Sequence, residues 1–227
     1  MPGRLLPLVT GEIYHVFNRG IDHRPTFTSV GEYKRALITI KFYRFSSQPV
    51  KLSRFLILSG EEKGKFFSDV KREEKFLVEF LSFCLMPNHF HFLIKQVQDG
   101  GISRFMSNFQ NSFTRYFNVK HERTGQLFLN QFKAVRIETD EQFLHVSRYI
   151  HLNPHSSFIV KNLSDLENYQ WSSLFEHLGD SKDGISNSET ILSFFKDKQN
   201  YKGFVFDQAN YQRELDKIKH LVIDSDT

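Results

Sequence analysis

The chain has 227 residues, 40% hydrophobic and 25% charged, a composition that excludes an intrinsically disordered protein and favours a globular one. A net charge of +4 and an isoelectric point of about 9.0 favour a polyanionic partner such as nucleic acid. The single cysteine, Cys84, excludes a disulfide framework, and no apolar run reaches the ~18 residues of a membrane span. With no secretory signal recognised in residues 1–10, a cytoplasmic protein is expected.

The first half of the chain is predicted to alternate between strands and helices. Period-two alternation of β-forming residues indicates strands, and apolar residues spaced by three and four indicate helices. Pro87 and Asn88 predict a tight turn that joins two strands as a hairpin. The elements expected here are a strand over 11–18, a helix over 30–45, an exposed excursion with short helical pieces over 50–73, and strands over 75–85 and 89–95.

The second half begins with the clearest helix, in which phenylalanines recur at helical spacing and form a core stripe. Thr139 and Gln142 have the spacing of a capping box and predict the start of another helix, which Pro154 is expected to end at Asn153. The expected elements are a helix over 102–119, a strand over 132–137, a helix from 139, and short helices over 171–175, 189–196 and 207–222.

The order strand, helix, strand, strand, helix, strand predicts an α+β fold. We expect a ferredoxin-like, split βαβ antiparallel sheet with two helices on one face. The helix that begins after Thr139 then lies across the open face. Residues 1–154 would form this domain, and residues 155–227 a helical C-terminal extension.

Candidate site residues come from two places in the chain. His89 and His91 lie two apart on one strand, so both point to the same face and can close on one divalent ion or phosphate. Tyr149 and Asn153 lie four apart on a helix and face the same way. Each pair also has an ordinary explanation, as polar strand surface or as a packing tyrosine with a helix cap. Their joint presence favours a site that holds a metal ion beside a tyrosine hydroxyl.

Several segments, in order over about residues 10–178, resemble a known family. They are Tyr14-His15-Val16-Phe17-Asn18-Arg19-Gly20, Leu85-Met86-Pro87-Asn88-His89-Phe90-His91-Phe92-Leu93, Arg123-Thr124-Gly125-Gln126-Leu127-Phe128, Phe132-Lys133, Tyr149-Ile150-His151-Leu152-Asn153-Pro154 and Trp171-Ser172-Ser173. Together they are similar to the REP-associated tyrosine transposases, single-tyrosine members of the HUH class (His, bulky hydrophobe, His). The excursion over 50–73 is longer than this resemblance leads one to expect.

The resemblance implies an enzyme that cleaves and joins single-stranded or hairpin DNA. It assigns the nucleophile to Tyr149, which would form a covalent 5′-phosphotyrosine, and the binding of Mg²⁺ or Mn²⁺ to His89, His91 and Asn153. Relatives occur as monomers and as dimers, so a homodimer with a shared site stays open.

Four basic residues are candidates for DNA contact because they lie in the matched segments or beside the expected site: Arg19, Arg123, Lys133 and Arg136. Two further functions stay open at this stage. One is a domesticated nucleic-acid-binding protein with the same fold and no cleavage. The other is a metal phosphoesterase that uses the histidines and a water nucleophile.

Overall fold

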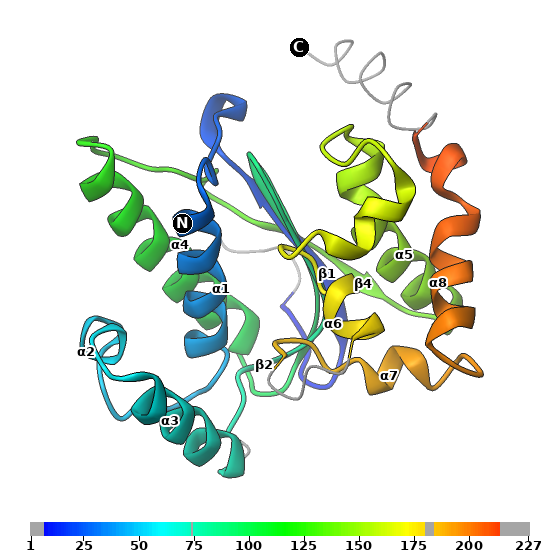
Figure 1. The fold of residues 1–227 in the computed structure, drawn as a ribbon. Helices are drawn as coiled ribbons and strands as arrows, with labels where there is room; N and C mark the ends of the chain where they lie inside the picture. Colours follow the sequence, from blue (N-terminus) through cyan, green and yellow to red (C-terminus); the bar gives the residue numbers. More distant parts are fainter. Residues whose placement is uncertain (1–6, 74, 180–183, 214–227) are drawn as a thin grey trace.

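A four-stranded antiparallel sheet forms the centre of the computed structural model, which describes residues 7–73, 75–179 and 184–213. The strands are β1 (Ile13–Arg19), β2 (Val78–Met86), β3 (His89–Gln96) and β4 (Lys133–Ile137), in the spatial order β2-β3-β1-β4. Helices α1 (Val30–Tyr43) and α4 (Gly101–Lys120) cover one face, and α5 (Asp140–Ser156) lies on the other (Figure 1). This arrangement confirms the predicted ferredoxin-like α+β class.

Aromatic packing holds α4 to the sheet. Phe90 and Phe92 of β3 alternate with the histidines and therefore point away from them, toward α4. Their rings lie 5.4 and 5.7 Å from the ring of Phe109. Phe105 and Phe113 continue the stripe along the helix and are fully buried. The predicted core role of these phenylalanines is confirmed, and it leaves the opposite face of β3 for chemistry.

Helix α5 begins where the capping box predicted. The Thr139 side chain accepts a hydrogen bond from the backbone N–H of Gln142 at 3.2 Å. Further along, the hydroxyl of Ser147 is bonded to that of Ser82 on β2, at 3.0 Å, and to that of Tyr201, at 2.8 Å. Because these groups are buried, the bonds fix how α5 lies on the sheet.

The prediction that Pro154 ends this helix is wrong, because α5 continues to Ser156 with the proline inside it. A proline in the last turn removes a single helical hydrogen bond. The turn is closed by other bonds, from the N–H of Ser157 to the carbonyl of Asn153 at 3.0 Å and from the N–H of Val160 to that of Pro154 at 2.9 Å. Residues 150–156 are all buried, so tertiary packing outweighs the local bias.

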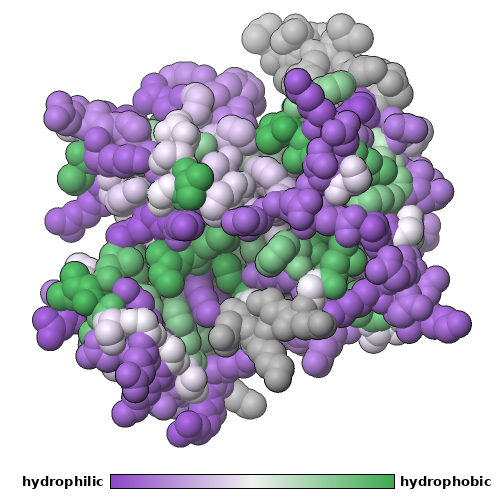
Figure 2. Space-filling view, in the orientation of Figure 1, coloured by the Kyte–Doolittle hydropathy of each residue, from purple (hydrophilic) through white to green (hydrophobic). Residues whose placement is uncertain are grey.

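The excursion between the first helix and the second strand forms two helices, α2 (Leu52–Leu56) and α3 (Gly60–Arg72). Both pack on the end of α1 through a phenylalanine cluster, in which the rings of Phe42, Phe55 and Phe66 lie 4.9–5.5 Å apart. In the face shown in Figure 2, a band of hydrophobic residues separates the α2–α3 region from the more hydrophilic part above it. The excursion is therefore a packed layer of the protein.

The C-terminal region covers the same sheet face as α5 (Figure 1). Residues 171–173 were expected to be helical, but they lie along the edge of β2, where the N–H of Leu85 donates to the carbonyl of Trp171 at 2.8 Å. The helices that follow are α6 (Leu174–Leu178), α7 (Glu189–Leu192) and α8 (Lys198–Asp207), and the short 3₁₀ turns of the chain are Ile21–His23 and Leu163–Asn168. Most of the helix expected over 207–222 lies outside the described residues. Within them, no helix is long and apolar enough to cross a membrane.

Candidate active site

Three histidines meet on the sheet face that α5 covers. In the antiparallel pairing of β1 with β3, His91 lies opposite Phe17 and His89 opposite Arg19, so these side chains share one face. His15, two residues before Phe17, shares it too. Nε2 of His15 is hydrogen bonded to Nδ1 of His91 at 3.0 Å, and the ring centroids of His89 and His91 are 5.0 Å apart.

His15 is the site residue that the sequence reasoning missed. The alternation of its strand assigns it to a face, but only the pairing of β1 with β3 brings it to His91. That pairing joins residues 76 positions apart in the chain. The segment of residues 14–20, which carries part of the family resemblance, was the signal that could have selected it.

Tyr149 of α5 lies against this histidine group. Its ring centroid is 5.5 Å from that of His91 and 6.0 Å from that of His15, with the rings edge to face in both pairs. The backbone carbonyl of Tyr149 accepts a hydrogen bond from the Gln212 side chain at 3.1 Å, which ties this turn of the helix to the C-terminal region. Tyr149 therefore contacts histidines of its own chain, as expected if this helix face meets the sheet.

The path of α5 carries Asn153 toward the hairpin turn. Ser147 contacts Ser82, whereas Tyr149 contacts His91, the partner of Cys84 in the hairpin. The helix thus advances in the direction from Ser82 to Cys84, and Asn153 lies one turn beyond Tyr149 in this direction. The Asn153 side chain is only 3% exposed, and its amide nitrogen has no hydrogen-bond partner among the described residues. An unpartnered buried N–H₂ group is a donor that an acceptor such as a phosphate oxygen satisfies, whereas a metal ion would bind the amide oxygen.

A hydrogen bond selects the tautomer of His89. Nδ1 of His89 lies 2.6 Å from the side-chain oxygen of Asn88, and because this oxygen can only accept, Nδ1 carries the proton. Burial lowers the pKa of His15 to about 4, so its ring is neutral at pH 7 and can accept the Nδ1 proton of His91 through Nε2. Each of His89 and His91 would then hold a metal through Nε2, the usual arrangement for a ligating imidazole.

His89 and His91 alone do not complete the coordination of a divalent ion, so a metal site here needs a further ligand that is neither an imidazole nor a carboxylate. In the part of the chain that the structure describes, no three His, Cys, Asp or Glu residues are arranged to hold a metal. A site built on His89 and His91 therefore needs an oxygen ligand of another kind, and the amide oxygen of Asn153 or water would supply it. Imidazole ligands suit Mn²⁺ better than Mg²⁺ and also fit Zn²⁺, so the ligand types alone do not select the metal.

Two of the predicted DNA-contacting residues lie on the same face as the histidines. Arg19 is opposite His89, and Lys133 of the edge strand β4 is opposite Phe17. The guanidinium of Arg19 is hydrogen bonded to the ring of His23 at 2.8 Å. Both cations lie beside the site, where a DNA phosphate bound near Tyr149 can meet them.

The other two predicted DNA-contacting residues, Arg123 and Arg136, are bonded to groups away from Tyr149. Arg136 points to the opposite sheet face, and its guanidinium forms an ion pair with Glu12 at 2.9 Å. Arg123 bends back on its own loop, where it donates to the side-chain oxygen of Asn118 and to the carbonyl of Gln126. The structure does not bring these two side chains to Tyr149.

Comparisons with known proteins bear on the fold and on the segment that holds the site. A family model described as "Transposase IS200 like" matches residues 57–153, which contain His89, His91, Tyr149 and Asn153 but not His15. A search of curated proteins found no match. Among solved structures, the REP-associated tyrosine transposase bound to a REP hairpin matches with a TM-score of 0.53 and 15% identity over 82% of this chain and 90% of that chain. The resemblance to the REP-associated tyrosine transposases is therefore confirmed, by the family model over residues 57–153 and by the fold over most of the chain.

Proposed function

We propose that the protein is a metal-dependent DNA transposase that cleaves and rejoins single-stranded or hairpin DNA with Tyr149 as the nucleophile. The observation that carries the proposal is the packing of Tyr149 against His91 and His15 inside one chain, with ring centroids 5.5 and 6.0 Å apart. The match to IS200-like transposases over the residues that form this site supports it.

The residue types suit phosphodiester cleavage. A tyrosine, with an ordinary pKa near ~10, becomes a good nucleophile when a nearby cation favours its ionised form. Mg²⁺ or Mn²⁺ held by His89, His91 and Asn153 would supply that cation and stabilise negative charge on the phosphate. As the Tyr149 oxygen bonds to phosphorus, the P–O3′ bond breaks, which leaves a 3′-hydroxyl and a 5′-phosphotyrosine. Attack by another 3′-hydroxyl reverses the step and joins DNA ends.

His15 positions His91 in this scheme. As a neutral, half-buried group it would accept the Nδ1 proton of His91 and fix the ring plane through the 3.0 Å hydrogen bond. Partners of this kind orient a metal ligand and raise its basicity. His15 itself would not touch the DNA.

Hairpin DNA is the proposed substrate. The similar transposase of known structure holds a REP hairpin, and Arg19 and Lys133 provide phosphate contacts beside Tyr149. Arg123 and Arg136 can join them only by exchanging their bonds with Asn118 and Glu12 for phosphate.

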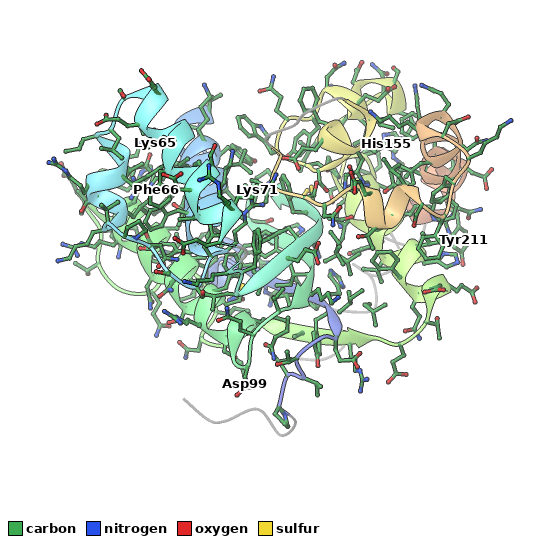
Figure 3. The ribbon with its side chains drawn as sticks, turned by 90° about the horizontal axis from the view of Figure 1, so that it is seen from below. Lys65, Phe66, Lys71, Asp99, His155 and Tyr211 are labelled. Atoms are coloured by element: carbon green, nitrogen blue, oxygen red, sulfur yellow. The ribbon has the colours of Figure 1, made fainter. Side chains whose placement is uncertain are left out.

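A denaturing-gel assay for a covalent adduct tests the proposal. Wild type, Tyr149→Phe and the control Tyr211→Phe, whose tyrosine is 63% exposed on the C-terminal side (Figure 3), are incubated with labelled hairpin strands and Mn²⁺. We expect a metal-dependent adduct with wild type and the control, and none with Tyr149→Phe.

The other outcomes point elsewhere. An adduct that persists in Tyr149→Phe would identify a different nucleophile. Cleavage without an adduct would favour a phosphoesterase that uses water. Binding without cleavage, in every metal and strand tested, would favour a nucleic-acid-binding protein that does not cut.

A further inference from the structure

A groove lies on the helical side of the protein, away from Tyr149. It is bounded by α1, α4 and the segment of residues 48–53 that leads into α2, and its volume is 980 Å³. This is at the upper end of the roughly 300–1,000 Å³ of small-molecule pockets, so an extended ligand fits it best. Since α1 and α4 cover the face opposite α5, the groove and the candidate active site lie on opposite sides of the sheet (Figure 1).

The lining of the groove is basic. Arg35, Lys51, Arg115 and Lys120 contribute to it, and no Asp or Glu does. Lys120 is paired with Glu32 at 2.6 Å, just outside the lining, whereas Lys51 and Arg115 are exposed. Cations without carboxylates among them attract a polyanion.

Aromatic and amide groups accompany the cations. The guanidinium of Arg35 lies over the ring of Tyr116, 5.0 Å from its centroid, and its buried Nε has no hydrogen-bond partner in the described part of the chain. Asn108 and Asn111 of α4 add side-chain amides. Planar groups stack on unpaired bases, and amides bond to base edges.

We propose that this groove binds unpaired DNA, the single strand that continues from the hairpin cleaved at Tyr149. Phosphates contact Lys51 and Arg115, and a base stacks on the pair formed by Arg35 and Tyr116. A duplex stem would use the cations but leave the planar groups without a role, because its bases are already stacked. The choice of DNA as the nucleic acid rests on the proposed function.

Helices α2 and α3 of the excursion position one side of the groove. Lys51 lies at the N-cap of α2, and the phenylalanine cluster of α2 and α3 holds this segment against α1. The excursion, longer than the family resemblance led us to expect, thereby forms one wall of the groove.

The test is fluorescence anisotropy with a labelled oligothymidine strand, which has no hairpin, and the full-length chain. The groove variant Lys51→Glu/Arg115→Glu is compared with Lys65→Glu/Lys71→Glu on α3 (Figure 3), which changes the net charge equally at exposed positions outside the lining. We expect affinity to fall at least about tenfold in the groove variant alone. The slope of log affinity against log salt should fall by about 1.4, or ~0.7 for each lost phosphate contact.

A third variant, Tyr116→Leu, keeps the charge and removes the stacking surface. It should weaken binding by at least about fivefold. Equal losses of affinity in the groove and α3 variants, or no loss in the groove variant, would overturn the proposal.

Covalent adducts formed on a hairpin without flanking strands test the role of Tyr149 separately from the groove. The groove variant should keep them, and their absence from wild type would refute the proposed function while leaving the binding result intact.

Discussion

Two buried histidines, one on α5 and one in the C-terminal region, are expected to make the protein sensitive to mild acid. His151 on α5 and His177 on α6 are both fully buried, with ring centroids 4.9 Å apart. Burial lowers the pKa of His177 to about 3, and burial, with a smaller electrostatic contribution from the neighbouring His177 ring, lowers that of His151 well below its ordinary value of 6.5. Both rings are therefore neutral in the folded protein and bind protons on unfolding.

The sign follows from the proton balance. Because both folded-state pKa values are depressed, the unfolded chain binds more protons below pH 6.5, and the free energy of unfolding falls as the pH decreases. Between pH 7 and pH 5 each histidine removes about 1.9 kcal/mol, from ~1.36 kcal/mol for each pH unit below the unfolded pKa. The pair should thus lower the stability by about 4 kcal/mol over this range.

Urea denaturation at pH 7 and pH 5 measures this loss. The variant His177→Leu should lose about 1.9 kcal/mol less than wild type between the two pH values, whatever its stability at pH 7. The control His145→Gln, at an exposed position of α5, should keep the full loss. The reasoning is refuted if His177→Leu and wild type lose the same free energy between the two pH values.

Three further predictions concern the site and the fold. His15→Phe should weaken Mn²⁺ binding by about 10–100-fold in calorimetric titration. His15→Gln, whose amide oxygen can accept from His91, should recover part of the lost affinity. Equal Mn²⁺ affinities of wild type and His15→Phe would argue against the positioning role. Asn153→Leu should abolish metal-dependent adducts yet leave the free energy of unfolding within about 1 kcal/mol of wild type, since the amide nitrogen is already unpartnered. Glu32→Gln should destabilise the protein by about 2 kcal/mol in urea denaturation, because this buried carboxylate accepts a 2.6 Å charged bond from Lys120.

The local spacing of residue types was sufficient to predict most of the fold and to select four candidate site residues, but it did not select His15. The alternation around His89 and His91 and the four-residue spacing of Tyr149 and Asn153 each depend on one element, so the sequence alone could assign their faces. His15 could not be selected in this way, because its contact with His91 depends on which strands are neighbours in the sheet. The end of α5 was mispredicted for a related reason: the packing around residues 150–156 outweighs the effect of Pro154.

The position of Tyr149 depends on residues far beyond the matched transposase segment. A chain of buried hydrogen bonds runs from Ser82 on β2 through Ser147 and Tyr201 to His151, with links of 3.0, 2.8 and 2.7 Å. It ties two points of α5, one on each side of Tyr149, to the sheet and to α8. A helix fixed on both sides of the proposed nucleophile cannot rotate Tyr149 away from His91 without breaking buried bonds, each of which would leave an unsatisfied polar group. The C-terminal helices therefore support the helix that carries Tyr149 and hold this side chain against the histidines of the same chain.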